Sequence, residues 1–307
     1  MEGKHAIGVD VGGTKILAGV VAEDGSVVRR HERATPHDSQ EHVLEELATA
    51  IDALLDDSVA AIGFGAPAPT DQKRGILFQT VNTPLGNVPL RDIMQERFGL
   101  PVGLDNDANA AAIGEWRAGA ARGVDDVLML TLGTGLGGGV ISEGRPFRGN
   151  NGIGVELGHV VIVHDGRPCQ GLCTGRGHLE PYVTGIAATA AAQEAFGPSA
   201  DAHRLVRLAQ EDGDETAIEI LREIGHYLGS GMGSFANVFA PELIVIGGGF
   251  GVAAFDFLIP SALEVMQREA LEPMRSMARV EKAQLGTAAG LIGAAFVAFE
   301  ALDAVAV

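Results

Sequence analysis

The segment HAIGVDVGGTK at residues 5–15 places an alternating apolar run directly before a pair of glycines, Gly12 and Gly13. Residues 16–21 are apolar again, and an Asp-Gly pair marks the next turn before residues 26–30. Apolar runs of period two that are joined by glycine turns are typical of β-hairpins. The segment therefore predicts a chain that opens with a β-meander.

The same unit occurs once more in the second half of the chain. Residues 126–132 predict a strand, a Gly-Thr-Gly turn follows, and residues 137–142 predict the returning strand. A buried strand is expected at residues 243–246, before three consecutive glycines. Helical periodicity occupies residues 42–55, 109–120, 185–195, 215–239, 259–271 and 288–301. The repeat predicts an α/β fold of two similar lobes that face each other across a cleft.

The charge of the chain limits its partners. Its 40 acidic and 22 basic side chains give a formal net charge of −18. A surface of that sign repels nucleic acid and anionic lipid, so neither is expected as a main partner. An anionic ligand would need local backbone N–H groups and a cation. Residues 1–5 lead directly into the first strand without the features of a signal peptide, and we expect a cytoplasmic protein.

The first glycine turn carries groups that suit phosphate. Gly12 and Gly13 offer backbone N–H groups, Thr14 offers a hydroxyl and Lys15 an ammonium, while Asp10 at the strand end can hold Mg²⁺ through water. A tight hairpin without a ligand is the alternative, and a single such motif would favour it. Two further glycine loops, at residues 133–139 and 247–249, follow predicted strands. The three loops together favour a nucleotide in the cleft.

Three polar residues, Asp105, Asn106 and Asp107, stand where a strand runs into a helix. Helix capping is the simplest explanation, but one cap needs only one such residue. The helix dipole stabilises a carboxylate at this position by about 0.3–1 kcal/mol. An ionised carboxylate can accept the proton of an attacking hydroxyl, as phosphoryl transfer to an alcohol requires.

Two cysteines and two histidines gather in one stretch of the second half. His159, Cys169, Cys173 and His178 have the residue types of a tetrahedral zinc site, and a metal suits this spacing better than a disulfide does. A glycine-rich loop with reduced thiols is the alternative, and His164 leaves the ligand set open. Two carboxylates that could accept hydrogen bonds from sugar hydroxyls flank these residues, namely Glu156 and Glu180.

These motifs, in this order, resemble the ROK (repressor, open reading frame, kinase) family, and particularly its bacterial glucokinases, over nearly the whole chain. The most specific stretches are NDANAA at residues 106–111, GTGLGGG at 133–139, ELGH at 156–159 and GHLE at 177–180. The resemblance implies an actin-like ATPase (ribonuclease H-like) fold. We expect a smaller lobe of residues 1–117 and 291–307 and a larger lobe of residues 118–290, in a homodimer or homotetramer.

The resemblance also implies ATP-dependent phosphorylation of a free hexose with Asp107 as catalytic base. Glucose is the first expectation; fructose, allose, N-acetylmannosamine or N-acetylglucosamine are alternatives, and a non-catalytic sugar sensor is a further one. The implied sugar ligands are Asn82, Asn106, Asp107, Glu156, His159 and Glu180. The nucleotide and Mg²⁺ are expected at Asp10, Gly12, Gly13, Thr14, Lys15, Gly133, Thr134, Gly135, Gly248 and Gly249. A repressor of the family would carry a DNA-binding domain before the first glycine loop, where this sequence has only a few residues.

Two features depart from the family pattern. The cysteines have the spacing C-x3-C instead of C-x-C, and the last ligand position holds His178 instead of cysteine. Because imidazole is an acceptable zinc ligand, a structural Zn²⁺ is still expected at His159, Cys169, Cys173 and His178. The stretch that begins at Asn82 lacks the tryptophan that commonly follows in the family, which bears on the choice of sugar.

Overall fold

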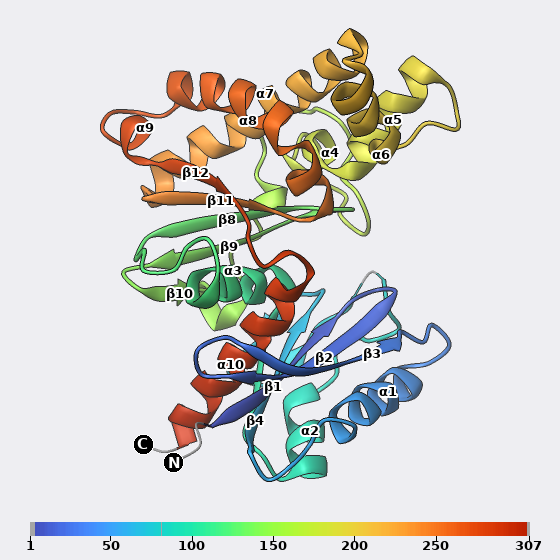
Figure 1. Ribbon diagram of the computed structural model, residues 1–307, viewed down its shortest axis with the longest axis vertical. Coiled ribbons are helices and arrows are strands. Elements are labelled where there is room, and N and C mark those ends of the chain that lie inside the picture. The colour runs from blue at the N-terminus through green and yellow to red at the C-terminus, as the bar shows by residue number, and fades with distance from the viewer. Residues whose placement is uncertain (1–3, 81, 306–307) are drawn as a thin grey trace.

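The computed structural model describes residues 4–80 and 82–305, which form two α/β halves stacked along the long axis (Figure 1). The sheet of the N-terminal half has the strand order β3-β2-β1-β4-β7, and that of the C-terminal half has the order β10-β9-β8-β11-β12. In the first sheet, β3, β2 and β1 pair antiparallel, and β1, β4 and β7 pair parallel. In the second sheet, β10, β9 and β8 pair antiparallel, and β8, β11 and β12 pair parallel. The two sheets repeat one topology, which confirms the predicted duplication.

The element bounds follow the sequence pattern closely in most places. The strands of the N-terminal sheet are β1 (His5–Val11), β2 (Lys15–Ala22), β3 (Val27–Ala34), β4 (Val59–Ala66) and β7 (Val102–Asn106), and β5 (Thr70–Asp71) pairs with β6 (Ile76–Leu77). The C-terminal sheet contains β8 (Val127–Leu132), β9 (Leu136–Ser142), β10 (Arg145–Phe147), β11 (Leu243–Gly247) and β12 (Arg279–Lys282). The helices are α1 (Gln40–Asp52), α2 (Leu90–Phe98), α3 (Asp107–Ala118), α4 (Glu180–Val183), α5 (Gly185–Phe196), α6 (Ala202–Arg207), α7 (Glu215–Phe239), α8 (Gly249–Glu269), α9 (Met274–Met277) and α10 (Ala289–Val305). Helix α7 has the predicted bounds, whereas α8 begins earlier than the predicted residue 259.

The last helix lies directly on the backbone of the N-terminal sheet. Gly8, Gly63 and Gly103 are neighbours across β1, β4 and β7. A Cβ added to Gly63 would stand 1.9 Å from the carbonyl oxygen of Ala294, and the other two glycines meet the backbone of α10 equally closely. This glycine row lets the helix approach closer than any side chain would allow. Helices α1 and α2 cover the opposite face (Figure 1).

Helix α3 lies between the two halves and is also packed through glycines. A Cβ on Gly137 of β9 would stand 2.6 Å from Cβ of Ala108, and one on Gly139 would stand 2.4 Å from Cβ of Ala112. On the other side, a Cβ on Gly293 of α10 would stand 1.6 Å from the carbonyl oxygen of Ala110. The helix that begins with Asp107 is therefore fixed against both halves at van der Waals contact.

Two long helices are apolar along much of their length and are partly buried inside the fold. Helix α8 and the stretch Gly286–Val305 are long and apolar enough to cross a membrane by length and composition. Their most apolar windows are, however, 50% and 44% buried inside the fold. Helix α8 packs with α7 over the C-terminal sheet, and α10 packs on the N-terminal sheet (Figure 1). The lobe boundaries given above from the sequence stay a prediction.

Candidate active site

A cavity of about 480 Å³ lies between the two sheets, as the predicted cleft requires. Its walls come from β1, α3, β8, β11 and the starts of α8 and α10. Four of the predicted site residues line it, namely Asp10, Asp107, Gly248 and Gly249. Residues that are far apart in the sequence are thus brought to one cavity by the facing of the two sheets.

Asp107 is the first residue of α3, and its carboxylate accepts one hydrogen bond, from the backbone N–H of Ala108 at 2.8 Å, while its neighbour Asn106 supplies the helix cap. Asn106 caps the helix: its side-chain oxygen accepts from the backbone N–H of Ala108 at 2.9 Å and of Asn109 at 3.3 Å. Asp105 is fully buried and points elsewhere. The capping explanation therefore accounts for Asn106 and leaves Asp107 at the wall of the cavity.

Burial dominates the electrostatics of Asp107. Burial raises the pKa of this carboxyl from 3.8 to about 7, the negative charge of Asp10 adds to the rise, and Glu156 adds less. A shift of about three pKa units corresponds to roughly 4 kcal/mol, which exceeds the 0.3–1 kcal/mol or so that the helix dipole supplies to the anion. Asp107 therefore changes its protonation near neutral pH, where a general base is most effective.

Asp10 stands on β1 at the same cavity. Burial raises its pKa to about 6, and the charge of Lys15 partly opposes the rise. Two partly protonated carboxyls therefore face one enclosed space. Such a pair favours a cation between or beside them, because a cation stabilises both charged forms.

The first glycine loop is a closed hairpin. The N–H of Gly12 donates to the carbonyl oxygen of Lys15 at 3.0 Å, and the hydroxyl of Thr35 donates to the carbonyl oxygen of Gly12 at 2.8 Å. Thr14 accepts from the backbone of Thr35 at 3.0 Å. The side chain of Lys15 pairs with Glu32 at 2.9 Å on the surface and is not among the residues that line the cavity. Asn82 lies against this loop, since a Cβ on Gly13 would stand 2.9 Å from its Cβ.

The second loop is tied to one of the predicted sugar ligands. The side chain of Glu180, at the start of α4, accepts from the backbone N–H of Leu136 at 2.9 Å. The turn itself closes with a hydrogen bond from Gly133 to Gly135 at 3.0 Å, and Thr134 lies between them. The second glycine loop and Glu180, a predicted sugar ligand, are thus directly connected.

The third loop is the N-terminus of a long helix. Gly248 has a φ of 77° and precedes α8, which begins at Gly249. Both residues line the cavity opposite Asp10 and Asp107. The unpaired N–H groups at a helix N-terminus form a ready site for an anion.

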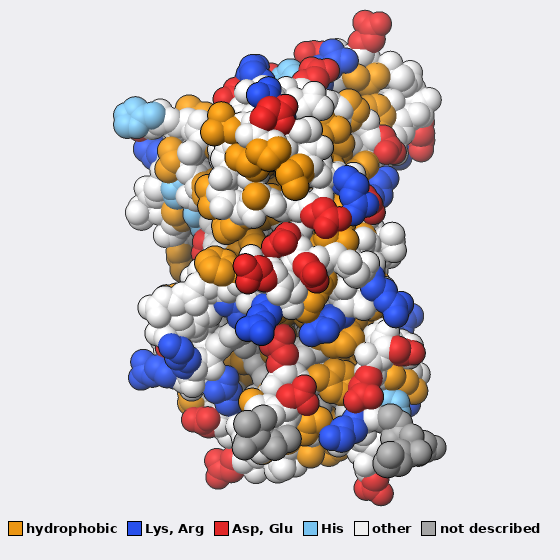
Figure 2. All heavy atoms as spheres, turned by 90° about the vertical axis from the view of Figure 1, so that its left-hand side faces the viewer, with side chains coloured by type: hydrophobic (Ala, Val, Ile, Leu, Met, Phe, Trp, Pro, Cys, Tyr) orange, Lys and Arg blue, Asp and Glu red, His pale blue; other side chains and the backbone are white. Residues whose placement is uncertain are grey.

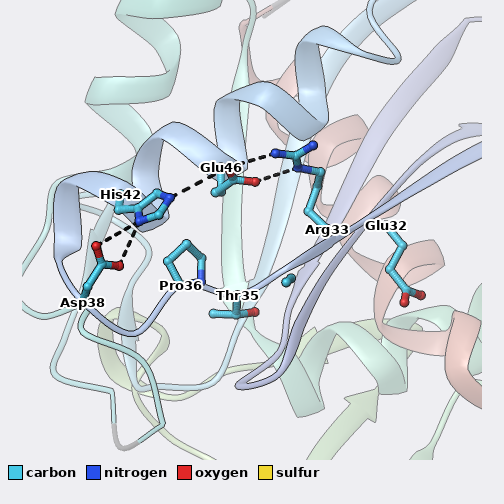
Figure 3. A pocket seen from close by; sticks show the side chains of 8 residues that line it. Glu32, Arg33, Thr35, Pro36, Asp38, His42 and Glu46 are labelled. Atoms are coloured by element: carbon cyan, nitrogen blue, oxygen red, sulfur yellow. Dashed lines mark hydrogen bonds and ion pairs between the residues drawn. The ribbon is translucent and has the colours of Figure 1, made fainter.

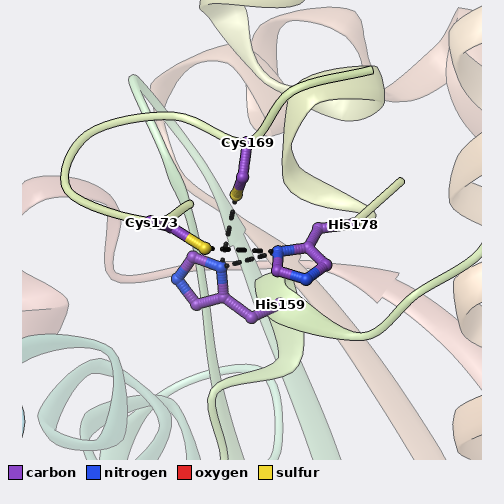
Figure 4. Close-up of side chains that lie close together, drawn as sticks. All are labelled: His159, Cys169, Cys173 and His178. Atoms are coloured by element: carbon purple, nitrogen blue, oxygen red, sulfur yellow. Dashed lines mark hydrogen bonds between the residues drawn. The ribbon is translucent and has the colours of Figure 1, made fainter. Parts of the chain in front are cut away.

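The four predicted zinc ligands converge, although they come from separate turns of one long loop (Figure 4). Their ligand atoms all lie within 4.8 Å of one another. The Nδ1 atoms of His159 and His178 are 3.3 Å apart, Sγ of Cys169 lies 3.4 Å from the first, and Sγ of Cys173 lies 3.6 Å from the second. His164 is not part of the cluster.

These separations fit a tetrahedral zinc ion. With Zn–N near 2.0–2.1 Å and Zn–S near 2.3 Å, tetrahedral geometry requires about 3.3 Å between two nitrogens and about 3.5 Å between nitrogen and sulfur. The backbone N–H of Gly175 also donates to Sγ of Cys173 at 3.4 Å, a type of contact that suits a metal-bound thiolate. Burial raises the pKa of the Cys169 thiol to about 11, so a cation is needed for that sulfur to act as a thiolate ligand.

Glu156 stands just before the turn that carries His159. Burial raises the pKa of its carboxyl, the charge of His159 opposes the rise, and Glu180 adds to it. Sugar hydroxyls are good partners for such carboxylates, because each can donate a hydrogen bond to an acceptor that water reaches poorly.

A second cavity, of about 440 Å³, lies beside the first hairpin (Figure 3). Its charged groups satisfy one another: Arg33 forms two hydrogen bonds to Glu46 at 2.6 and 2.9 Å, and His42 pairs with Asp38 at 2.8 Å. None of the predicted site residues lines it. We therefore take the cavity between the sheets as the candidate active site.

One buried ion-pair network was not predicted from the sequence. Arg148, which follows β10, pairs with Asp105 and with Glu300, each at 2.7 Å. A single arginine after a short strand gives no signal in one sequence, because its partners lie 43 and 152 positions away.

Known proteins are similar to this chain in sequence and in fold. A profile of the ROK family matches residues 6–301. The glucokinase of Streptomyces coelicolor is 34% identical, with 96% of this chain and 97% of the relative covered. The N-acetyl-D-glucosamine kinase of Pectobacterium atrosepticum is 32% identical, with 94% and 97% covered.

A solved structure agrees with the fold. The ROK family glucokinase from Streptomyces griseus, solved in complex with glucose and AMPPNP, superposes with a TM-score of 0.83 at 36% identity. The alignment covers 96% of this chain and 99% of that one. The expected actin-like ATPase fold is thereby confirmed. By sequence over nearly its whole length and by fold, this chain belongs to the ROK family.

Proposed function

We propose that this protein transfers the terminal phosphoryl group of ATP to a hydroxyl of a free hexose, with glucose as the first substrate. The observation that carries the proposal is Asp107, which stands at the inter-sheet cavity with its pKa raised to about 7. The N-terminus of α8 lines the same cavity and suits an anionic group. The relatedness to kinases that act on sugars supports the same reaction.

The proposed step is an in-line displacement. Asp107 accepts the proton of the hexose 6-hydroxyl, whose oxygen forms a bond to the γ-phosphorus while the bond to the β-phosphate oxygen breaks. ADP leaves with the electron pair, and glucose 6-phosphate keeps the transferred group. A magnesium ion held near Asp10 would balance the phosphate charge that the chain itself does not neutralise.

The remaining predicted residues take two roles in this proposal. The sugar is bound by Asn82, Asn106, Glu156, His159 and Glu180. The nucleotide is bound by the backbone of Gly12, Gly13, Thr14, Gly133, Thr134, Gly135, Gly248 and Gly249, and Lys15 would have to leave Glu32 to reach it. The bond from Leu136 to Glu180 supports a link between the two sets, because movement at one would be felt at the other.

We also propose a structural zinc ion at His159, Cys169, Cys173 and His178. The support is the set of nitrogen and sulfur separations, which match the edges of a zinc tetrahedron. The ion would fix the loop and hold the His159 ring toward the sugar. Two reduced cysteines at such a site suit a cytoplasmic protein, which is our proposed location.

The self-association that we propose is a homodimer, with a homotetramer as the alternative. A group of exposed apolar side chains at one end of the C-terminal half supports it. Phe147 packs on Phe239 with ring centroids 6.2 Å apart, and Val238 and Leu271 beside them are 72% and 65% exposed. Figure 2, which faces the side of the molecule where β10 and α9 lie, shows hydrophobic side chains gathered over this half. Light scattering across a range of protein concentrations tests the mass in solution.

The reaction is tested by ADP release with ATP and Mg²⁺ over glucose, fructose, allose and N-acetylhexosamines. We expect turnover with glucose, and we expect Asp107→Asn to abolish turnover while glucose binding, measured by calorimetry, survives. Near wild-type turnover in Asp107→Asn would refute the role of the carboxylate. Polyphosphate and ADP as donors are compared in the same assay.

A second candidate activity is phosphorylation of N-acetylglucosamine, since a relative with that name is nearly as similar as the glucokinase. The two are separated by the ratio of kcat/KM for the two sugars. A larger value for N-acetylglucosamine would replace glucose as substrate and leave the proposed chemistry of Asp107 unchanged. No turnover with any sugar or donor would instead favour a sugar sensor.

A further inference from the structure

One buried guanidinium connects the two halves of the molecule beside the proposed base. Nε of Arg148 lies 2.7 Å from Oδ2 of Asp105, and its second terminal nitrogen lies 2.7 Å from Oε2 of Glu300. The Arg148 side chain is only 16% exposed, and that of Asp105 is fully buried. The pair of Arg148 with Asp105 is therefore an internal cross-link, whereas Glu300, with a side chain 37% exposed, binds Arg148 from the surface.

The elements that the contacts of Arg148 join belong to different sheets. Arg148 directly follows β10 at the edge of the C-terminal sheet. Asp105 stands near the end of β7 in the N-terminal sheet, and Glu300 lies on α10, which packs on that sheet. If the two halves move relative to each other near Asp107, the contacts of Arg148 with Asp105 and Glu300 must either move with them or break.

Asp105 uses its other oxygen to hold the start of the helix that carries the base. Its Oδ1 accepts from the backbone N–H of Asn106 at 2.8 Å and from the side-chain amide of Asn109 at 3.0 Å. Arg148 takes the remaining oxygen. Every contact of this carboxylate thus fixes either the helix start or the opposite half, and Asp107 lies two residues along the same backbone.

On the other side, Arg148 anchors the segment that leads to Glu156. Its carbonyl oxygen accepts from the N–H of Gly154 at 2.9 Å, which closes the segment into a loop. Asn151 lies inside the loop with a φ of 57°, and Val155, directly after the loop, has a φ of 69°. A branched side chain such as valine adopts a positive φ only where the surroundings hold it there. The segment is therefore constrained from its first residue to Glu156.

We propose that Arg148 is a positioning residue that sets the separation between Asp107 and the Glu156 side of the sugar site. The inference rests on the proposed function, in which Asp107 is the base and Glu156 a sugar ligand. In this proposal the Arg148 side chain acts on Asp105, and through that contact it holds the first residue of the loop that leads to Glu156 against the N-terminal half; the bond that closes the loop is a backbone contact. Because misplacement of a reacting group by about 1 Å can cost on the order of a hundredfold in rate, a looser link should be visible in the kinetics.

The alternative is a purely structural role, in which loss of Arg148 lowers stability and the amount of folded enzyme but no kinetic constant of the folded fraction. Steady-state kinetics separate the two. We expect Arg148→Met to lower kcat by about 10- to 100-fold and to raise KM for the hexose several-fold. KM for ATP should stay within about twofold, because the glycine loops do not depend on this link. Arg148→Lys, which keeps the charge, should recover part of kcat.

The controls cover folding and unspecific loss of an ion pair. Arg268→Met removes an arginine whose pair with Glu269 is largely exposed, and it should leave all constants unchanged. If Arg148→Met does not fold, the double variant Asp105→Asn with Arg148→Met removes both buried charges, and the same kinetic criteria apply to it. Wild-type kcat and hexose KM in whichever of these variants folds would overturn the inference.

The two proposals fail separately. If Asp107→Asn keeps its turnover, the proposed base is wrong, whatever the Arg148 variants do. If Asp107→Asn is inactive and still binds glucose, but the folded Arg148 variant has unchanged kcat and hexose KM, only the positioning role is wrong.

Discussion

Replacement of Asp107 by asparagine should stabilise the ligand-free protein at pH 8 although it abolishes phosphoryl transfer. The reason is that burial, with help from Asp10, raises the pKa of this carboxyl from 3.8 to about 7. At pH 8 the folded protein must hold a buried charge that the unfolded chain exposes to water. Asparagine has nearly the same shape, and its side-chain oxygen can still accept the 2.8 Å hydrogen bond from the N–H of Ala108.

The magnitude and sign follow from linkage. Unfolded chains release this proton near pH 3.8, whereas the folded protein keeps it until about pH 7. The stabilisation that the protonated Asp107 provides is therefore complete below pH 3.8 and is lost as the pH rises to 7. A difference of about three pKa units makes the loss roughly 4 kcal/mol at most. The advantage of Asp107→Asn should grow over the same interval and then stay constant.

The assay is unfolding of the ligand-free protein at pH 5 and pH 8, by heat and by urea. For a chain of this size we expect a rise in Tm on the order of 5–10 °C at pH 8 and a clearly smaller one at pH 5. The exposed Asp57→Asn serves as a matched control and should show no pH-dependent difference. An equal shift at both pH values, or a loss of stability at pH 8, would contradict a buried carboxyl with a raised pKa.

Three further outcomes are expected. Cys173→Ser or prolonged chelation should remove one zinc per chain, measured by metal analysis, and should weaken hexose binding more than nucleotide binding; a full-strength hexose site without metal would contradict this. Gly63→Ala should lower Tm strongly or prevent folding, because the new Cβ would stand 1.9 Å from the carbonyl oxygen of Ala294. Glu115→Ala should cost on the order of 3 kcal/mol in urea unfolding with little change in hexose KM. Glu115 is fully buried and accepts from the backbone of Ala120, Gln284 and Leu285 at 2.8–3.1 Å.

The duplicated strand pattern was predictable because the signals are local. Each half begins with two apolar runs around a glycine turn, and the neighbouring antiparallel strands β1 and β2, and β8 and β9, follow from that unit. The bounds of α7 were also predictable, since Asp214 caps a helix with strong periodicity. The start of α8 was not predictable: Gly249 and Gly251 look like a loop in the sequence, and the close packing of Gly251 against Leu132 is not visible there.

The glycines of β9 are the clearest case of a signal with two meanings. In the sequence, Gly137 and Gly139 belong to the same glycine cluster as the loop that precedes them, and the whole cluster suggests a phosphate site. In the structure their missing side chains make room for Ala108 and Ala112 of α3. A glycine that makes room for a ligand and one that makes room for a helix look alike in one sequence, because the group that it contacts lies far away in the chain or outside it.

The net charge of the chain also does not show how the charged side chains are distributed around the cavity. A net charge of −18 indicated that an anionic nucleotide would need backbone groups and a cation. Among the residues that line the inter-sheet cavity there is no lysine or arginine, and Lys15 is paired with Glu32 outside it. The cavity offers two acidic side chains, Asp10 and Asp107, and the N-terminus of α8.

This arrangement separates two tasks that a basic side chain would have combined. Backbone N–H groups can direct phosphate oxygens without adding a mobile charge, and the neutralising charge can then come from a divalent cation beside Asp10. A cation there also opposes the negative charge that helps to raise the pKa of Asp107. A cation bound there would therefore favour the ionised form of the proposed base, which the acidity of the empty cleft disfavours.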